Sequence, residues 1–317
     1  DYEYTSDKSR HDFFFQDFAS KIIYSPGEKD QITLSGLFAT SSTDFSFFDG
    51  EEIKVDSLTT KNNGLSLKWD HKRTDNRKIT LKTYLSNYRS YYNNEEFLTG
   101  PSAEEINIRG NTITDFGAAL TSDYQITESK TFSVGYELSN TQVKVELSKE
   151  KPNFPEEGYS IPSSEKNFMN AIFGEYTQTI KQAGMFRTGL RVVHYDNIGK
   201  ILLEPRLTIR YPLTKSISAN ASFEMRNQSI SQLIEFNYTE LRLENNIWQL
   251  SDNSRYPLLG SRQISGGLLF DRKGLTIDLE TYYKKINGLT SFSNEFNTPG
   301  LIFSEGTSTI KGFDFLV

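Results

Sequence analysis

The sequence predicts an all-β chain that forms a transmembrane antiparallel β-barrel, with about thirteen strands arranged as successive hairpins. Three observations predict this fold. Apolar and polar residues alternate strictly in many runs along the chain. Several of these runs are roughly twice the usual strand length of about five or six residues in soluble sheets. Short and long connections between the runs also follow one another in turn, as they do in outer-membrane barrels.

The alternation separates an apolar face from a charged face. In residues 202–211, Leu203, Leu207 and Tyr211 point one way while polar residues point the other, because side chains two positions apart share a face. A charge against lipid costs about 2–4 kcal/mol at the bilayer midplane, so the charged face is expected to line a wet lumen. The residues predicted to face the lumen are Glu204, Arg206, Arg210, Glu224, Arg226, Asp278 and Glu280. Glu204 and Arg206 are expected to pair across the inner wall with Glu224 and Arg226.

The elements follow in order along the chain. Runs such as 65–70, 132–138, 217–226 and 275–280 alternate as strands. Residues rich in Pro, Gly, Asn and Asp predict short turns, since they supply the restricted or left-handed φ values that turns need. These turns are at 25–30, 74–76, 127–130, 181–184, 212–215 and 271–274. Longer loops are expected near 48–62, 93–111, 148–166, 228–260 and 289–307. A soluble β-sandwich, the alternative fold, has no reason to keep this asymmetry.

Composition agrees with a barrel and excludes other classes. The chain has 317 residues, of which 36% are hydrophobic, and its mean hydropathy is −0.54. No apolar run approaches the length of about 18 residues that a membrane helix needs, so any insertion must use strands. The absence of cysteine excludes disulfides, thiolate metal sites and a cysteine nucleophile. The net charge of −6 argues against nucleic acid as a partner.

Both ends of the sequence are interpreted as cut. The first ten residues are polar and show none of the features of a signal peptide. At the other end, Phe313, Phe315 and Val317 still alternate with polar residues when the sequence stops. We therefore expect residues 1–317 to be one partial barrel domain, truncated at both ends.

Four stretches resemble TonB-dependent outer-membrane receptors, particularly those of the Bacteroidetes type. They are LLEPRL at 202–207, QLIEF and ENNIW at 232–236 and 244–248, TIDLETYYKK at 276–285, and STIKGFD at 308–314. Each stretch is a weak signal alone, but their order and spacing agree with the family over about residues 165–317, and more diffusely upstream.

The resemblance implies a 22-stranded barrel whose lumen is filled by an N-terminal plug domain, which these residues lack along with the TonB box. It implies an outer-membrane location in a Gram-negative bacterium and active uptake of a scarce nutrient, with a ferric siderophore or similar iron complex as the expected small-molecule ligand. The partners implied are outer-membrane lipid and TonB with its inner-membrane motor complex, acting through the plug region. The alternatives are a non-transporting adhesin or binding protein, or a passive porin.

No enzyme, cofactor or metal site is predicted. The three histidines, His11, His71 and His194, are far apart in sequence and lack partners at metal-ligand spacing. No serine has the context of a nucleophile elbow, so an outer-membrane hydrolase has no support.

Aromatic residues where long loops meet the lumen are the candidate ligand contacts, because they give large contact area at low entropy cost. The alternative is that they belong to the aromatic girdle found at the interfaces of any barrel. The candidates are Phe236, Tyr238, Trp248, Tyr256 and Tyr92, with Tyr91 as the neighbour that faces the other way.

Overall fold

The computed structural model describes residues 10–49, 52–97, 103–180, 184–236, 247–252, 254–293 and 303–317. The strands are β1 (Arg10–Tyr24), β2 (Asp30–Asp49), β3 (Glu52–Thr74), β4 (Arg77–Phe97), β5 (Glu105–Thr127), β6 (Lys130–Glu150), β7 (Tyr159–Ile180), β8 (Gly184–Tyr195), β9 (Lys200–Pro212), β10 (Ile217–Gln228), β11 (Ile230–Phe236), β12 (Ile247–Leu250), β13 (Leu259–Arg272), β14 (Leu275–Ser293) and β15 (Phe303–Leu316). A single 3₁₀ turn at Pro155–Glu157 is the helical element of these residues. Within the described part of the chain, no helix is long and apolar enough to span a bilayer.

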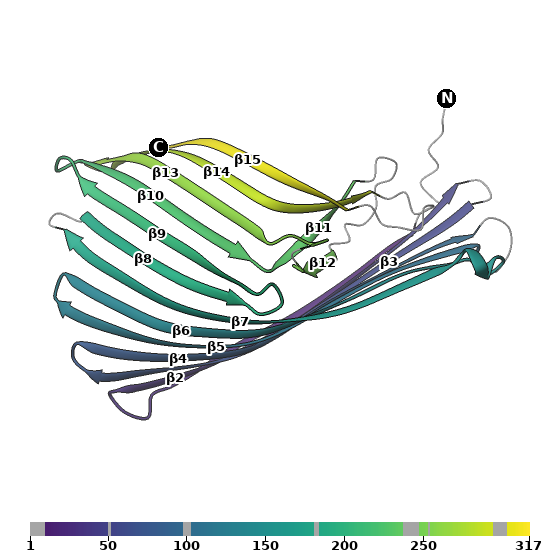
Figure 1. Cartoon of the computed structure of the whole chain (residues 1–317), viewed down its shortest axis with the longest axis horizontal. Coiled ribbons are helices and arrows are strands. Elements are labelled where there is room, and N and C mark those ends of the chain that lie inside the picture. The colour runs from purple at the N-terminus through teal and green to yellow at the C-terminus, as the bar shows by residue number, and fades with distance from the viewer. Residues whose placement is uncertain are drawn as a thin grey trace.

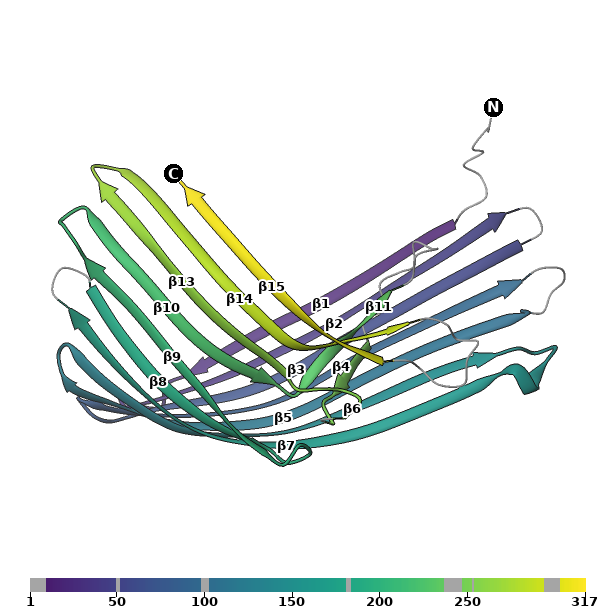
Figure 2. The same cartoon turned by 45° about the horizontal axis from the view of Figure 1, so that its top comes forward.

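Thirteen of the described strands form a continuous curved wall. Each pairs antiparallel with its neighbour in the order β1 to β10, then β13, β14 and β15. Figures 1 and 2 show this wall as an open trough with the short strands β11 and β12 on its concave side. The predicted transmembrane β-barrel fold and the predicted number of wall strands are therefore confirmed.

The strands of the first half are longer than predicted. Strands β2 to β7 have 20–23 residues each, whereas β8, β9 and β10 have 12 or 13. The predicted loops at 48–62, 93–111 and 148–166 were wrong over most of their length, because these segments pair as strands. A strand needs about 9–11 residues to cross a membrane, so the remainder projects beyond it. In this projecting part both faces of a strand contact water, so apolar and polar residues no longer alternate. Its sequence therefore resembles that of a loop.

The turns at the other end agree with the sequence prediction. Between β13 and β14, Lys273 and Gly274 both have positive φ, at 53° and 83°. This is the geometry of a two-residue type I′ hairpin turn, which glycine adopts without strain. The connection between β8 and β9, at 196–199, is also a short turn, and it was not predicted from the sequence. Long and short connections therefore do not alternate strictly.

The two faces of the wall are assigned from the position of β11 and β12. These strands contact Val143 and Val145 of β6, so the odd-numbered residues of β6 face the concave side. Strand register carries this assignment across the sheet. On the convex side the large apolar residues are exposed, and one cross-strand row at mid-height contains Trp69, Leu81, Leu120, Tyr136 and Ile172. A continuous exposed apolar belt of this kind is stable against lipid and not against water.

Three glycines of the wall allow an aromatic ring to lie across the neighbouring strand. The pairs are Tyr84 with Gly117, Phe173 with Gly135, and Tyr282 with Gly312. A Cβ atom added at these glycines would lie 2.2–2.3 Å from the ring. Since any other residue would push the ring away, the glycines are required by this close approach.

We expect Gly117→Val to destabilise the barrel by about 1–3 kcal/mol, the usual cost of overpacking a filled site. The new side chain would displace the ring of Tyr84, whose hydroxyl donates a 2.6 Å hydrogen bond to Asp115. Urea titration of the whole protein folded in lipid vesicles measures the change. Gly64→Val on β3 is the matched control, because nothing lies within 4 Å of a Cβ at that position. Equal losses in the two variants would contradict this role for Gly117.

Candidate functional site

The site is built where the β11–β12 hairpin, defined as strands β11 and β12, enters the concave side of the wall. Strand β11 leaves the end of β10 and pairs with β12 through Ile230–Leu250 and Leu233–Ile247. Its end then pairs in parallel with β14, Ile234 opposite Ser291. Strands β11 and β12, which belong to the connection between β10 and β13, thereby lie on the concave side of the wall, as both views show (Figures 1 and 2).

An apolar contact holds the hairpin against the wall. Leu233, Ile247 and Leu250 of the hairpin pack on Val143 and Val145 of β6, and Leu250 and Val143 are both 0% exposed. Lumen-facing strand positions are expected to be polar, so these two valines are an apolar patch on a wet wall. The patch is buried by the hairpin, and this burial is the hydrophobic contribution to docking.

A side-chain amide adds a directional contact. Asn111 of β5 is 2% exposed, and its carboxamide bonds both backbone groups of Trp248. Its Oδ1 accepts from the Trp248 amide at 2.8 Å, and its Nδ2 donates to the Trp248 carbonyl at 3.0 Å. The same Nδ2 lies 3.1 Å from the Lys144 carbonyl. Asn111 therefore pairs with β12 as a neighbouring strand would, and it fixes the position of the hairpin along the wall.

Polar side chains hold the base of the hairpin. Asn197 donates to the Ser251 carbonyl at 2.6 Å, and the Tyr195 hydroxyl donates to the Asn227 carbonyl at 3.1 Å. Burial raises the pKa of Asp252, but the backbone amides of Tyr256 and Ser254 outweigh it and hold that pKa below its usual range. These contacts tie the base of the hairpin to strand β8 and the turn that follows it.

Glu165 of β7 faces the same region and behaves in the opposite way. Its burial, and then the nearby Asp252 carboxylate, raise its pKa, and a hydrogen bond from Gln249 of β12 only partly offsets this. Near the base of the hairpin, the pKa of Glu165 is therefore raised and the pKa of Asp252 is lowered from their usual values.

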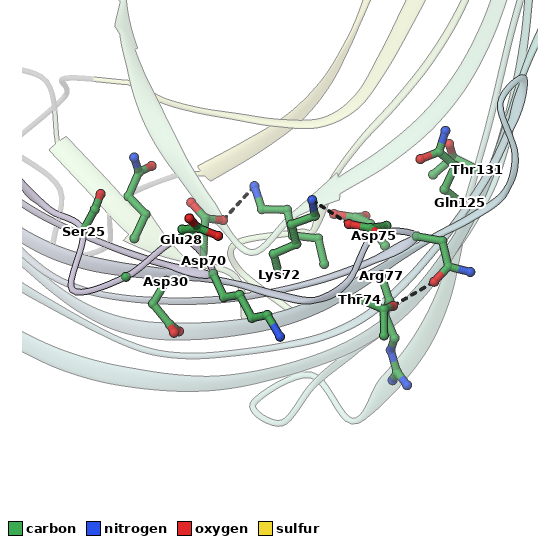
Figure 3. Close-up of a pocket in the computed structure, with 16 residues that line it drawn as sticks. Ser25, Glu28, Asp30, Asp70, Lys72, Thr74, Asp75, Arg77, Gln125 and Thr131 are labelled. Carbon is green, nitrogen blue, oxygen red and sulfur yellow. Dashed lines mark hydrogen bonds and ion pairs between the residues drawn. The ribbon is translucent and has the colours of Figure 1, made fainter.

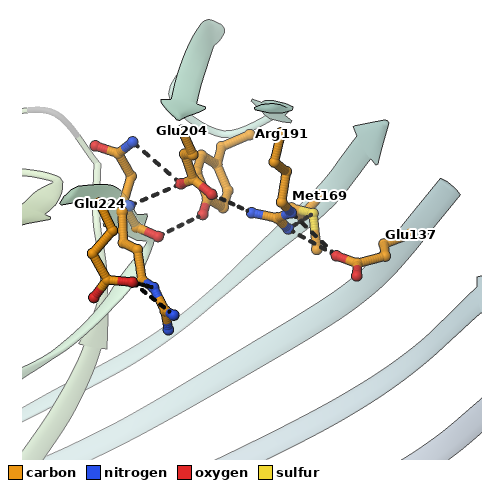
Figure 4. A network of polar contacts seen from close by, with 8 residues as sticks. Glu137, Met169, Arg191, Glu204 and Glu224 are labelled. Atoms are coloured by element: carbon orange, nitrogen blue, oxygen red, sulfur yellow. Dashed lines mark hydrogen bonds and ion pairs between the residues drawn. The ribbon is translucent and has the colours of Figure 1, made fainter. Parts of the chain in front are cut away.

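A network of charged side chains from strands β6, β8 and β9 lies on the concave face of the wall (Figure 4). Arg191 of β8 bridges two carboxylates, at 2.7 Å from Glu204 and 3.1 Å from Glu137. Glu204 also accepts the backbone amide of Asn227 at 2.8 Å. Strands β6, β8 and β9 are thus joined through one guanidinium group, and Glu204 connects this network to the end of β10.

A cavity of about 570 Å³ opens beside this network. Its lining carries both signs of charge: the cations are Arg191, Arg206, Arg226 and Lys284, and the anions are Glu137, Glu204 and Glu224. Arg226 lies 3.0 Å from Glu224, and Arg206 lies 3.6 Å from Glu175. Such a lining can bind polar or charged groups by hydrogen bonds and ion pairs.

A second cavity, of about 500 Å³, lies at the end of the wall where the short turns are (Figure 3). Asp70 accepts from Lys68 at 2.5 Å, from Lys78 at 2.9 Å and from Thr80 at 2.7 Å. Lys72 pairs with Asp75 at 2.9 Å. Because these charges satisfy one another, we assign them to the support of the rim.

The structure places the predicted aromatic residues differently from one another. Trp248 and Tyr256 are half-buried, and Tyr256 packs beside the apolar contact of the hairpin. Tyr92 is 2% exposed within β4, and its hydroxyl donates to Asp56 at 2.6 Å, so its ring belongs to the wall. Tyr91 faces the opposite side and is exposed. Phe236 ends β11, with only its backbone described, and Tyr238 lies outside the described residues.

The charged residues predicted for the lumen lie on one face, the concave one. Register places Glu204, Arg206, Arg210, Glu224, Arg226, Asp278 and Glu280 on this face. Their pairing differs from the expected one, since the ion pairs join Arg191 to Glu204 and Arg206 to Glu175. The partner of Glu204 is therefore Arg191 of β8, the strand before β9. We expected this partner on β10, the strand after β9. Arg191 alternates on β8 directly opposite Glu204, and this register was the signal that could have identified it.

A metal-binding cluster is absent from the described part of the chain. Within those residues, no group of three or more His, Cys, Asp or Glu side chains is placed to hold a metal ion. The site therefore consists of an inward hairpin, a charged inner wall and a cavity between them.

The architecture of the chain is similar to that of several solved protein structures. No family model matches the chain, and no curated protein matches its sequence. Solved structures match 96–98% of it: the copper transporter OprC (TM-score 0.64, 12% identity), the RagAB peptide transporter (0.61, 10%) and the ferric citrate transporter FecA (0.57, 10%). The chain spans about half of their length, at 50%, 44% and 53%.

The chain has the fold of an outer-membrane β-barrel. Identities this low show the fold alone, and the exposed apolar belt agrees with it. A barrel of this kind is a protein of the Gram-negative outer membrane. The three similar structures are described as transporters of copper, peptides and ferric citrate, so this fold accommodates different cargoes.

Proposed function

We propose that this chain is part of the barrel of a TonB-dependent outer-membrane receptor that actively transports a scarce nutrient, with a ferric siderophore or similar iron complex as its substrate. The observation that carries the proposal is the match of 97% of the chain to half of a solved outer-membrane transporter. Residues 1–317 would then be one part of the barrel domain. The rest of that domain and the plug lie outside this sequence.

The inward hairpin supports active transport over passive diffusion. A passive porin needs an open aqueous channel, whereas here the β11–β12 hairpin is fastened across the lumen face by Asn111 and by the apolar contact on β6. A solute that must pass a fastened hairpin and a plug needs an energy source. TonB with its inner-membrane motor complex, acting through the plug region, is the source that the family resemblance supplies.

The charges of the cavity support a charged or polar substrate. Arg206 and Arg226 line the cavity but pair with carboxylates of the wall, whereas Lys284 forms no ion pair among the described residues. A carboxylate of an iron chelate can bind such a lysine by a charge-assisted hydrogen bond. FecA is described as a ferric citrate transporter, which agrees with an iron complex as substrate. Trp248, Tyr256, Phe236 and Tyr238 are proposed to contact the ligand from the hairpin segment. Tyr92 is left out of this set because its ring is enclosed in the wall.

Excision of residues 229–258 should abolish capture while leaving the barrel assembled. Gln228 pairs with Leu259, so the ends of β10 and β13 already lie side by side and a short Gly-Ser turn can join them. We expect uptake of ⁵⁵Fe-loaded siderophores by iron-starved cells to fall at least about tenfold, equivalent to about 1.4 kcal/mol of binding. The whole protein should still migrate as a folded barrel.

Three outcomes separate the functions. Uptake by the unmodified protein that disappears in cells without TonB supports the proposal. Uptake that persists without TonB would identify a porin, and binding to surfaces without any uptake would identify an adhesin. Normal uptake by the excised variant would remove the hairpin segment from ligand capture while leaving TonB-coupled transport in place.

A further inference from the structure

A row of cations crosses the convex face of the wall. Lys61 of β3 pairs in register with Arg89 of β4, Arg89 with Thr112 of β5, and Thr112 with Lys144 of β6. All four positions have the parity of the apolar belt and therefore point away from the lumen. Lys61, Arg89 and Lys144 are exposed. The sequence alone does not reveal this row, because the strands that form it were predicted partly as loops.

The row lies just beyond the edge of the apolar belt. Four residues from Lys61, Arg89 and Thr112, in the direction of the short turns, the same three strands carry Leu65, Leu85 and Phe116, all exposed and facing outward. Four residues span about 13 Å along a strand, which is about 9 Å along the membrane normal at a tilt of about 45°. The cations are therefore level with the lipid headgroups of the outer leaflet.

A groove of about 620 Å³ lies along this row. Arg89 and Lys144 line it from two sides, and Thr112, Gln142 and Ser164 contribute polar side chains that can donate hydrogen bonds. Gly110 lines the groove one row further from the belt, and its missing side chain leaves space between Tyr91 and Glu146. One carboxylate, Glu146, also lines this end, so the groove itself holds two cations and one anion.

The charge of the row is not neutralised by the protein. Among the described residues, Lys61, Arg89 and Lys144 form no ion pair, whereas in the lumen Arg191 and Arg206 pair with carboxylates. Lys166 on β7 adds a further exposed cation beside Gln142. A row of unpaired cations at headgroup level attracts anionic lipid.

We propose that Lys61, Arg89 and Lys144 form a binding site for the phosphate groups of a phosphorylated lipid in the outer leaflet. Arg89 and Lys144 stand two strands apart, which is about 10 Å between their backbones. Their long side chains can converge on one phosphate in the groove, and Lys61 can bind a second. The acyl chains of the lipid would lie against Leu85 and Phe116 directly below.

The test is binding of phosphorylated lipid A to the whole protein in detergent micelles, followed by native mass spectrometry. We expect saturable binding that weakens at least about tenfold in the variant Lys61→Gln/Arg89→Gln/Lys144→Gln. The charge-matched control is Lys130→Gln/Lys215→Gln/Lys273→Gln, which removes three lysines at the opposite rim and should bind as the unmodified protein does. Binding by the unmodified protein should also weaken as salt rises from about 0.05 M to about 0.5 M.

Several results would overturn the proposal. Unchanged binding by the first variant, or an equal loss in the control variant, would remove the row from lipid recognition. Equal binding of lipid A stripped of its phosphates would show that acyl chains alone are bound. Binding of inorganic phosphate as tight as that of lipid A would identify a site for a soluble anion instead of a lipid.

Discussion

Leu120→Arg is expected to make the free energy of folding into a bilayer less favourable by about 2–4 kcal/mol, the cost of an arginine at the midplane. Leu120 is 50% exposed on the convex face of β5, in the mid-height row of the apolar belt. Lipid covers this row in the membrane, so an arginine there must either lose its hydration or extend toward the interface. Both routes cost free energy, and neither is offset by a carboxylate.

Thr121→Arg, one residue further along, should change the same quantity by no more than about 0.5 kcal/mol. Thr121 points into the lumen, where an arginine remains hydrated, and its register partner Thr80 bonds the Asp70 carboxylate. Urea titration of the whole protein, folded in lipid vesicles, measures both variants. Equal losses at the two positions would contradict the assignment of the faces, and with it the membrane orientation of every strand in the wall.

The parity of side chains could be predicted from the sequence because it depends only on neighbouring residues. Leu203, Leu207 and Tyr211 alternate with charged residues, and the structure places the two sets on opposite faces of β9. The lengths of β3 to β7 could not be predicted in the same way. Beyond the membrane both faces of these strands meet water, so no period distinguishes a paired strand from a loop.

The inward hairpin could not be predicted for a different reason. Asn111 and Trp248 are separated by 137 positions, and nothing in either local sequence indicates the contact. Trp248 and Tyr256 could be singled out as aromatic residues in a long connection, but their half-buried position depends on β6, a distant strand. Val143 and Val145 were the available signal, since apolar residues on the lumen-facing parity of β6 require a cover.

Asn111→Leu is expected to release the hairpin from the wall. The substitution keeps a similar side-chain volume but removes the partners of the Trp248 amide and carbonyl, and of the Lys144 carbonyl. A buried backbone group left without a partner costs about 1–3 kcal/mol, so docking should weaken by about 2 kcal/mol or more. Hydrogen exchange of the amides of Ile247–Leu250 should then accelerate at least about tenfold, because exchange follows the free energy of local opening.

Mass spectrometry of hydrogen exchange in the whole protein provides the measurement, on a peptide that contains β12. Asn87→Leu is the matched control, since the Asn87 amide bonds Thr114 at 2.9 Å within the wall and does not touch the hairpin. Exchange in β12 should be unchanged in that variant. If Asn111→Leu leaves it unchanged as well, the apolar contact with Val143 and Val145 holds the hairpin by itself. The hydrogen bonds of Asn111 would then be dispensable for docking of the hairpin.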